Sequence, residues 1–108
     1  MATIEIDGAR IQDWSSFHRE CKQAFGFPAT YASTMDAWVD CLSYLRDAEN
    51  MTQFLLKPNE KLAINLLNTE LMREQAPDIL EEMAFCIGGI NERYEDYGEK
   101  PALELLLR

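Results

Sequence analysis

The chain has 108 residues, of which 47% are apolar and 10% aromatic, and this composition suffices for one packed core. We therefore expect a single domain over residues 1–108. Acidic residues outnumber basic ones by 19 to 10, and the resulting net charge of -9 disfavours direct binding of DNA or RNA. Such a charge suits a basic partner, although it is also common in proteins that only need to remain soluble.

The first two expected elements are a strand and a helix. Residues 3–6 (TIEI) alternate β-branched and charged side chains, which predicts a strand, and Asp7-Gly8 predicts a turn after it. Asp13 has the position of a helix N-cap, and Gly26 has that of the residue ending the helix. Between them, apolar residues recur at spacings of three and four and predict a buried stripe: Trp14, Phe17, Cys21, Ala24 and Phe25.

A second helix is predicted over residues 33–47 (STMDAWVDCLSYLRD), after the loop FPATYAS. At about 100° per residue, one face is apolar and directed to the core. The other face carries polar residues that lie within about 40° of Asp36 around the helix axis. The apolar face comprises Met35, Trp38, Leu42 and Leu45, and the polar face comprises Asp36, Asp40, Ser43 and Asp47. Val39 falls between the two faces and should be partly exposed.

The two aspartates inside this helix are predicted to be available to a partner. No lysine or arginine follows Asp36 or Asp40 at the i+4 position, where a neutralising side chain is usually found. Ser33 and Asp36 also have the spacing of a capping box, so Asp36 can start the helix, bind a partner, or do both. Asp40 lies beyond the first turn, and its alternative is an ordinary solvated aspartate.

The second half of the chain predicts two more strands and two more helical segments. Residues 50–60 lose periodicity around a turn at Pro58-Asn59, and residues 61–67 form a short apolar strand. A brief helical turn over residues 68–75 precedes a longer helix that starts at Pro77 and frays into the acidic tail ERYEDYGEK. That helix directs five apolar residues to the core: Ile79, Leu80, Met83, Ile87 and Ile90. After Pro101, ALELLL predicts a final strand.

Strands separated by helical segments imply crossover connections, so the expected fold is α/β. We expect a small three-stranded parallel sheet with packed helices. The start of the chain lacks the basic and apolar pattern of a secretion signal, and no stretch reaches the roughly 18 apolar residues of a membrane span. These features predict a cytoplasmic protein that does not contact membranes.

Residues capable of catalysis or metal binding are sparse. His18 is the only histidine, is predicted at the surface or rim, and would need two further ligands to bind zinc together with Cys21. The three cysteines show no CxxC spacing and are expected to be reduced and mostly buried: Cys21, Cys41 and Cys86. Gly88-Gly89 lacks the Lys-Ser/Thr of a phosphate loop and should either allow close helix–sheet approach or loosen its helix. We expect no enzyme activity, no metal and no cofactor.

The stretch FPATYASTMDAWVDCL resembles the signature of the barstar family, intracellular inhibitors of barnase-type ribonucleases. The matching positions are Phe27-Pro28, Tyr31, Asp36-Ala37 and Asp40-Cys41-Leu42. The order of elements fits the family over the whole chain, with a longer connection at residues 46–60. Thr30, Ala32 and Val39 depart from the family's second tyrosine, glycine and tryptophan, which leaves open a ribonuclease other than barnase.

The resemblance implies an inhibitor whose acidic helix and preceding loop occlude the active site of a basic ribonuclease or nuclease toxin. Asp40 would be the central phosphate mimic, Asp36 its neighbour one turn earlier, and Glu92 a further acid near the end of the long helix. The partner-binding residues are predicted to be Tyr31, Thr34, Asp36, Val39, Asp40, Ser43 and Glu92. The alternative is an interaction module of the same fold that binds a different basic partner. An enzyme using paired acids ranks last, and the oligomeric state is left open.

Overall fold

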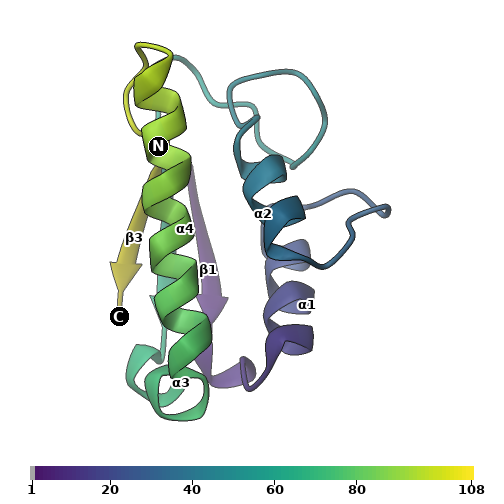
Figure 1. The fold of residues 1–108 in the computed structure, drawn as a ribbon, viewed down its shortest axis with the longest axis vertical. Coiled ribbons are helices and arrows are strands. Elements are labelled where there is room, and N and C mark those ends of the chain that lie inside the picture. The colour runs from purple at the N-terminus through teal and green to yellow at the C-terminus, as the bar shows by residue number, and fades with distance from the viewer. Residues whose placement is uncertain (1) are drawn as a thin grey trace.

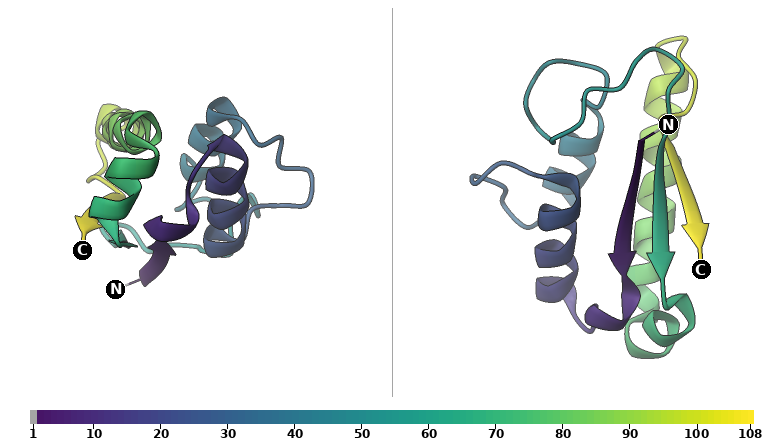
Figure 2. Two further views of the ribbon diagram at one scale, coloured as in Figure 1. Left: turned by 90° about the horizontal axis from the view of Figure 1, so that it is seen from below. Right: turned by 180° about the vertical axis from the view of Figure 1, so that it is seen from behind.

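A computed structural model describes residues 2–108 and contains a three-stranded parallel sheet in the order β1-β2-β3. The strands are β1 (Ala2–Asp7), β2 (Leu62–Leu67) and β3 (Leu103–Leu107). All helices lie on one face of this sheet, and the opposite face is uncovered (Figures 1 and 2). The predicted α/β class and the parallel sheet are therefore confirmed.

The helices form two groups on the covered face of the sheet. Helices α1 (Trp14–Phe25) and α2 (Met35–Leu42) lie beside the β1 edge. Helix α4 (Pro77–Asp96) runs along the sheet with the short α3 (Thr69–Gln75) at its lower end in Figure 1. A single 3-10 turn, η1 (Gly8–Arg10), connects β1 to α1.

Side chains in β1 alternate because only one face of the sheet is covered. Ile4 and Ile6 are buried beneath the helices, whereas Thr3 and Glu5 are exposed on the open face. The predicted strand at residues 3–6 is thus confirmed. Its alternation is the pattern expected of a half-buried strand, although parallel sheets are usually covered on both faces.

Helix α1 begins and ends where local signals predicted. Asp13 caps it, since Oδ1 accepts a hydrogen bond from the Ser16 amide (2.8 Å) and the Ser16 hydroxyl accepts one from the Asp13 amide (3.1 Å). Gly26 ends it in the left-handed conformation with φ of 69°. Trp14, the first residue of the predicted apolar stripe, is 41% exposed, so the fully buried part of the stripe begins after it. Phe17, Cys21 and Phe25 are fully buried.

Helix α2 is shorter than the predicted 33–47, because a distant tyrosine hydroxyl replaces its last hydrogen bonds. The hydroxyl of Tyr94 on α4 donates to the Leu42 carbonyl (3.0 Å) and accepts from the Leu45 amide (3.0 Å). In a continuing helix, these two groups would bond the amide of Arg46 and the carbonyl of Cys41. Helix α2 therefore ends at Leu42, and Asp47 lies outside it.

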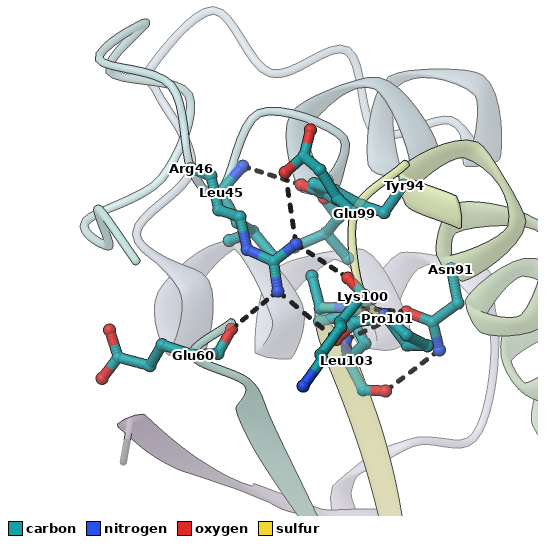
Figure 3. Close-up of polar contacts among 11 residues, drawn as sticks. Leu45, Arg46, Glu60, Asn91, Tyr94, Glu99, Lys100, Pro101 and Leu103 are labelled. Atoms are coloured by element: carbon teal, nitrogen blue, oxygen red, sulfur yellow. Dashed lines mark hydrogen bonds and ion pairs between the residues drawn. The ribbon is translucent and has the colours of Figure 1, made fainter. Parts of the chain in front are cut away.

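The chain after α2 is held by the side chain of Arg46, which is only 6% exposed. Its guanidinium donates to the carbonyls of Glu60 (2.9 Å) and Lys100 (2.7 Å) and pairs with Glu99 (3.3 Å), as Figure 3 shows. It also lies over the Tyr94 ring, 5.1 Å from the centroid. Arg46 thereby ties the end of α2 to the segments that lead into β2 and β3.

Helix α4 continues to Asp96, so most of the predicted acidic tail is helical rather than frayed. Asn91 holds this end against the sheet. Its Oδ1 accepts from the amides of Ala102 (3.1 Å) and Leu103 (3.0 Å), and its Nδ2 donates to the Leu103 carbonyl (3.0 Å; Figure 3). The five predicted core residues of α4 are all buried: Ile79, Leu80, Met83, Ile87 and Ile90.

The two glycines within α4 are not explained by close packing. A Cβ added at Gly88 or Gly89 would meet nothing within 4 Å, and both positions are exposed. The prediction that they allow close helix–sheet approach is therefore wrong. Gly8 does meet that need, because a Cβ there would lie 2.8 Å from the Leu67 carbonyl oxygen.

Across residues 2–108, no helix is long and apolar enough to cross a membrane. In the same residues, no group of three or more histidine, cysteine, aspartate or glutamate side chains is arranged to hold a metal ion.

Candidate functional site

The N-terminus of α2 is capped by Thr34 rather than through a Ser33–Asp36 capping box. The Thr34 hydroxyl accepts a hydrogen bond from the Ala37 amide (3.1 Å), whereas Ser33 lies outside the helix with φ of 56°. The capping-box role considered for Asp36 is therefore wrong. Asp36 occupies the first turn of the helix, where the helix dipole favours a negative charge. This interaction leaves the carboxylate oxygens available to accept hydrogen bonds from a partner.

Asp36 and Asp40 are both exposed and stand one turn apart on α2. Among residues 2–108, neither carboxylate forms a salt bridge, as the absence of i+4 basic residues predicted. Trp38 and Leu42 on the opposite face are fully buried, and Val39 between the faces is half-buried, as expected. Helix α2 thus presents two unneutralised carboxylates from a firmly packed base.

The loop before α2 is anchored by His18, which is buried rather than at the surface as predicted. His18 is 5% exposed, and its Nδ1 lies 2.6 Å from the Tyr31 hydroxyl. Burial lowers the pKa of His18 and raises that of the Tyr31 phenol, so both groups are neutral at pH 7. The Tyr31 ring also packs on Phe27, with centroids 4.6 Å apart. Tyr31 therefore fixes the loop as well as forming part of its half-exposed surface.

Ser43, the residue that follows α2, connects it to α4. Its hydroxyl donates to the Val39 carbonyl (2.7 Å) and accepts from a guanidinium nitrogen of Arg93 (3.2 Å). Arg93 is exposed and forms no salt bridge within the described part of the chain. A cation therefore lies next to the polar face of α2, where sequence reasoning expected only acids.

Glu92, the acid expected from the long helix, is exposed on α4 immediately before Arg93. Successive residues of a helix are rotated by about 100° around its axis. The Glu92 side chain therefore points in a different direction from the Arg93 side chain, which reaches Ser43. A cleft lies between the end of α2 and the last turns of α4. Asp96, one helical turn after Glu92, lines this cleft, whereas Glu92 does not. Sequence reasoning missed Asp96 because it treated this end of the helix as frayed.

The three cysteines are weak nucleophiles in this environment. Burial raises the pKa of the Cys21 thiol to about 12. Burial, with a smaller contribution from its hydrogen bond to Glu82, raises that of Cys86 to about 11. Burial and the charge of Asp40 also raise the pKa of Cys41. All three are free, and Cys21 and Cys41 are buried while Cys86 is half-buried, in line with the prediction of reduced, mostly buried thiols.

Comparison with protein families gives a match over nearly the whole chain. The family profile described as "Barstar (barnase inhibitor)" matches residues 1–105 of the 108-residue chain. None of the curated proteins compared with the chain matches it. The matched range includes all the helices, β1, β2, the first three residues of β3 and the whole exposed face of α2.

Proposed function

The chain belongs to the barstar family of barnase inhibitors, and from this membership we propose that it inhibits a basic ribonuclease in the cytoplasm. The observation that carries the proposal is the pair of exposed carboxylates, Asp36 and Asp40, which no basic side chain neutralises among residues 2–108. The inhibitor performs no chemistry. It occupies the surface of the nuclease that would otherwise bind RNA.

Asp40 is the central group in this mechanism. Ribonuclease active sites use arginine, lysine and histidine side chains to hold phosphate oxygens, and a carboxylate can accept the same charge-assisted hydrogen bonds. Asp40 has no capping role and forms no ion pair with any of residues 2–108, so binding a cation would break no ion pair among them. Asp36 stands about 6 Å earlier along the helix axis and provides a second negative group on the same face.

The residues around the two aspartates supply shape more than charge. Tyr31 offers a half-exposed ring beside the start of α2, while Thr34 is exposed at the cap and Val39 forms an apolar flank. Ser43 is already hydrogen-bonded to Arg93, so it contributes to the surface together with that cation. We keep Glu92 as a contact implied by the family resemblance, although the geometry of α4 favours it less than the residues on α2.

The test is inhibition of RNA cleavage by a panel of small basic ribonucleases that includes barnase. Wild-type protein should suppress at least one of them at a near-stoichiometric ratio. Asp40→Ala should weaken that inhibition by about 2–5 kcal/mol in binding free energy, because it leaves the enzyme's buried cations unpaired. The same substitution should change the free energy of unfolding by less than about 0.5 kcal/mol, since the side chain is exposed and unbonded.

Glu74→Ala is the matched control, because it removes an exposed acid from α3, at the other end of the molecule. It should leave inhibition almost unchanged. Equal losses for the two variants would mean that overall charge, rather than Asp40, carries binding. If wild-type protein inhibits no ribonuclease in the panel, the alternative of an interaction module for another basic partner is favoured, as the departures at Thr30, Ala32 and Val39 would then suggest.

A further inference from the structure

A cleft of about 700 Å³ opens between the end of α2 and the last turns of α4. The cleft adjoins the exposed face of α2, because Ser43, the residue that follows this helix, lines the cleft. Its walls contain three tyrosines, three acids and two arginines: Tyr44, Tyr94, Tyr97, Asp47, Asp96, Glu99, Arg46 and Arg93.

The inner wall of the cleft already holds a cation. The Arg46 guanidinium lies over the Tyr94 ring and pairs with the Glu99 carboxylate (3.3 Å; Figure 3). Aromatic faces and carboxylates are the two kinds of group that attract a guanidinium in proteins. Since Arg46 and Glu99 neutralise each other, this inner part adds no net charge to the cleft.

The outer wall also contains aromatic rings and carboxylates, but it holds no buried cation among residues 2–108. Tyr97 is 85% exposed and Tyr44 is 39% exposed, so both rings offer free surface. Asp47 and Asp96 are exposed and form no salt bridge within residues 2–108. Tyrosine is enriched at protein–protein interfaces, and here two exposed tyrosines share a cleft with two carboxylates that form no salt bridge among residues 2–108.

Among residues 2–108, Arg93 is the one cationic side chain that lines the outer cleft, and its charge repels a bound cation. Its guanidinium is held toward the α2 side by the hydrogen bond to Ser43 (3.2 Å). Two carboxylates and one guanidinium, none of them in a salt bridge among residues 2–108, leave the outer cleft negative within a chain of net charge -9. The occupant that complements such a cleft is a cationic group.

We propose that this cleft receives an arginine or lysine side chain of the protein partner, placed between Tyr44 and Tyr97 and paired with Asp47 and Asp96. This proposal extends the proposed function, and it rests on a basic protein being the partner. It adds a second recognition point that does not use Asp36 or Asp40. It also gives Arg93 a role in specificity, because Arg93 lowers affinity for cations at this point and narrows the set of partners that fit.

The test uses a small probe, so that its outcome is independent of ribonuclease inhibition. N-acetyl-arginine amide is titrated into the full-length protein, and backbone amide chemical shifts are followed by NMR. N-acetyl-citrulline amide has nearly the same shape without the charge and serves as the matched probe. Saturable shifts should be centred on Ser43, Tyr44 and Tyr97 with the arginine probe and should be absent with citrulline.

Three variants give effects of different sign. Asp96→Asn and Tyr97→Leu should each weaken binding of the arginine probe about two- to fivefold. Arg93→Gln should strengthen binding by a similar factor, since it removes a repulsive charge. Asp78→Asn makes the same charge change as Asp96→Asn at the opposite end of α4, where it should have no effect.

The proposal would be overturned if citrulline and arginine produced the same shifts, or if the shifts were spread evenly over the acidic surface. Equal effects of Asp96→Asn and Asp78→Asn would overturn it as well, because the response would then reflect net charge alone. A positive probe titration without inhibition of any ribonuclease would retain the cleft and reject the ribonuclease as partner. Inhibition without probe binding would retain the proposed function and reject the cleft.

Discussion

At the scale of single residues, His18 links pH to the loop that precedes α2. It is the only histidine in the chain, it is 5% exposed, and it contacts the Tyr31 hydroxyl through Nδ1 (2.6 Å). Burial lowers its pKa below the ordinary value of 6.5. The folded protein therefore binds this proton less readily than the unfolded chain does.

From this shift we predict that stability falls as pH drops through about 6.5 toward the folded-state pKa of His18. In that window the unfolded chain binds a proton that the folded chain does not, so the free energy of unfolding rises with pH. Urea unfolding measured at about pH 7.5 and about pH 5.5 should show this slope in wild-type protein. His18→Gln should flatten it, whatever its effect on absolute stability.

Tyr31→Phe is the control for this prediction, since it keeps the imidazole and removes only the hydroxyl that contacts it. It should retain the slope. Protonation of Asp7 and Asp13 should reduce stability only at lower pH, because hydrogen bonds with Asn68 and Ser16 hold the pKa values of these two carboxyl groups below 3.8. An unchanged slope in His18→Gln would contradict the assignment to His18.

At the scale of elements, α4 serves as the support for α2. Tyr94 ends α2 through two hydrogen bonds, Arg93 bonds Ser43, and Asn91 attaches the same turns of α4 to β3. These contacts come from one end of a 20-residue helix. The middle of that helix is different, because Gly88 and Gly89 are exposed and lack neighbours that would require a glycine.

We predict that Gly88→Ala and Gly89→Ala each raise the free energy of unfolding by about 1 kcal/mol. Glycine in a helix interior is less favourable than alanine by this amount, and the added Cβ meets nothing within 4 Å. Urea unfolding measures the gain. Gly8→Ala should instead destabilise, since its Cβ would lie 2.8 Å from a backbone oxygen. A loss of stability in the two α4 variants would show that helix propensity does not govern these positions.

At the scale of the whole molecule, charge should govern the approach of a partner. The net charge of -9 creates a field that attracts a basic protein before contact, and salt screens that field over a Debye length of about 10 Å at 0.1 M. The pair of barnase with barstar is itself a standard case of such steered association, so the expectation of steering is not specific to this chain. The family match makes it the natural case to test here.

We therefore predict that the association rate with an inhibited basic ribonuclease falls roughly tenfold or more between about 0.05 M and about 0.5 M NaCl. The dissociation rate should change less, because close contacts between buried groups are poorly screened. Stopped-flow mixing measures the first and a chase with unlabelled inhibitor measures the second. An association rate insensitive to salt would argue against charge mimicry.

Much of the fold could be predicted because its signals are local. Alternation in residues 3–6, the cap at Asp13, the terminator at Gly26 and the apolar spacing from Ile79 to Ile90 each depend on neighbours within a few residues. The same holds for the two faces of α2, since the spacing of Trp38, Asp40 and Leu42 alone separates core from surface. Side-chain periodicity and backbone preference act over one or two turns, so they can be read from the sequence.

The sequence by itself thus determined the α/β class, the strands, the buried face of α2 and the resemblance that the family match confirms. Only the tertiary structure decided where α2 ends, that His18 is buried, and that Tyr44, Tyr97 and Asp96 meet in one cleft. Each of these depends on groups far apart along the chain, as when the Tyr94 hydroxyl bonds Leu42. A hydrogen bond between residues 52 positions apart leaves no periodic trace in sequence, because packing alone brings its atoms together.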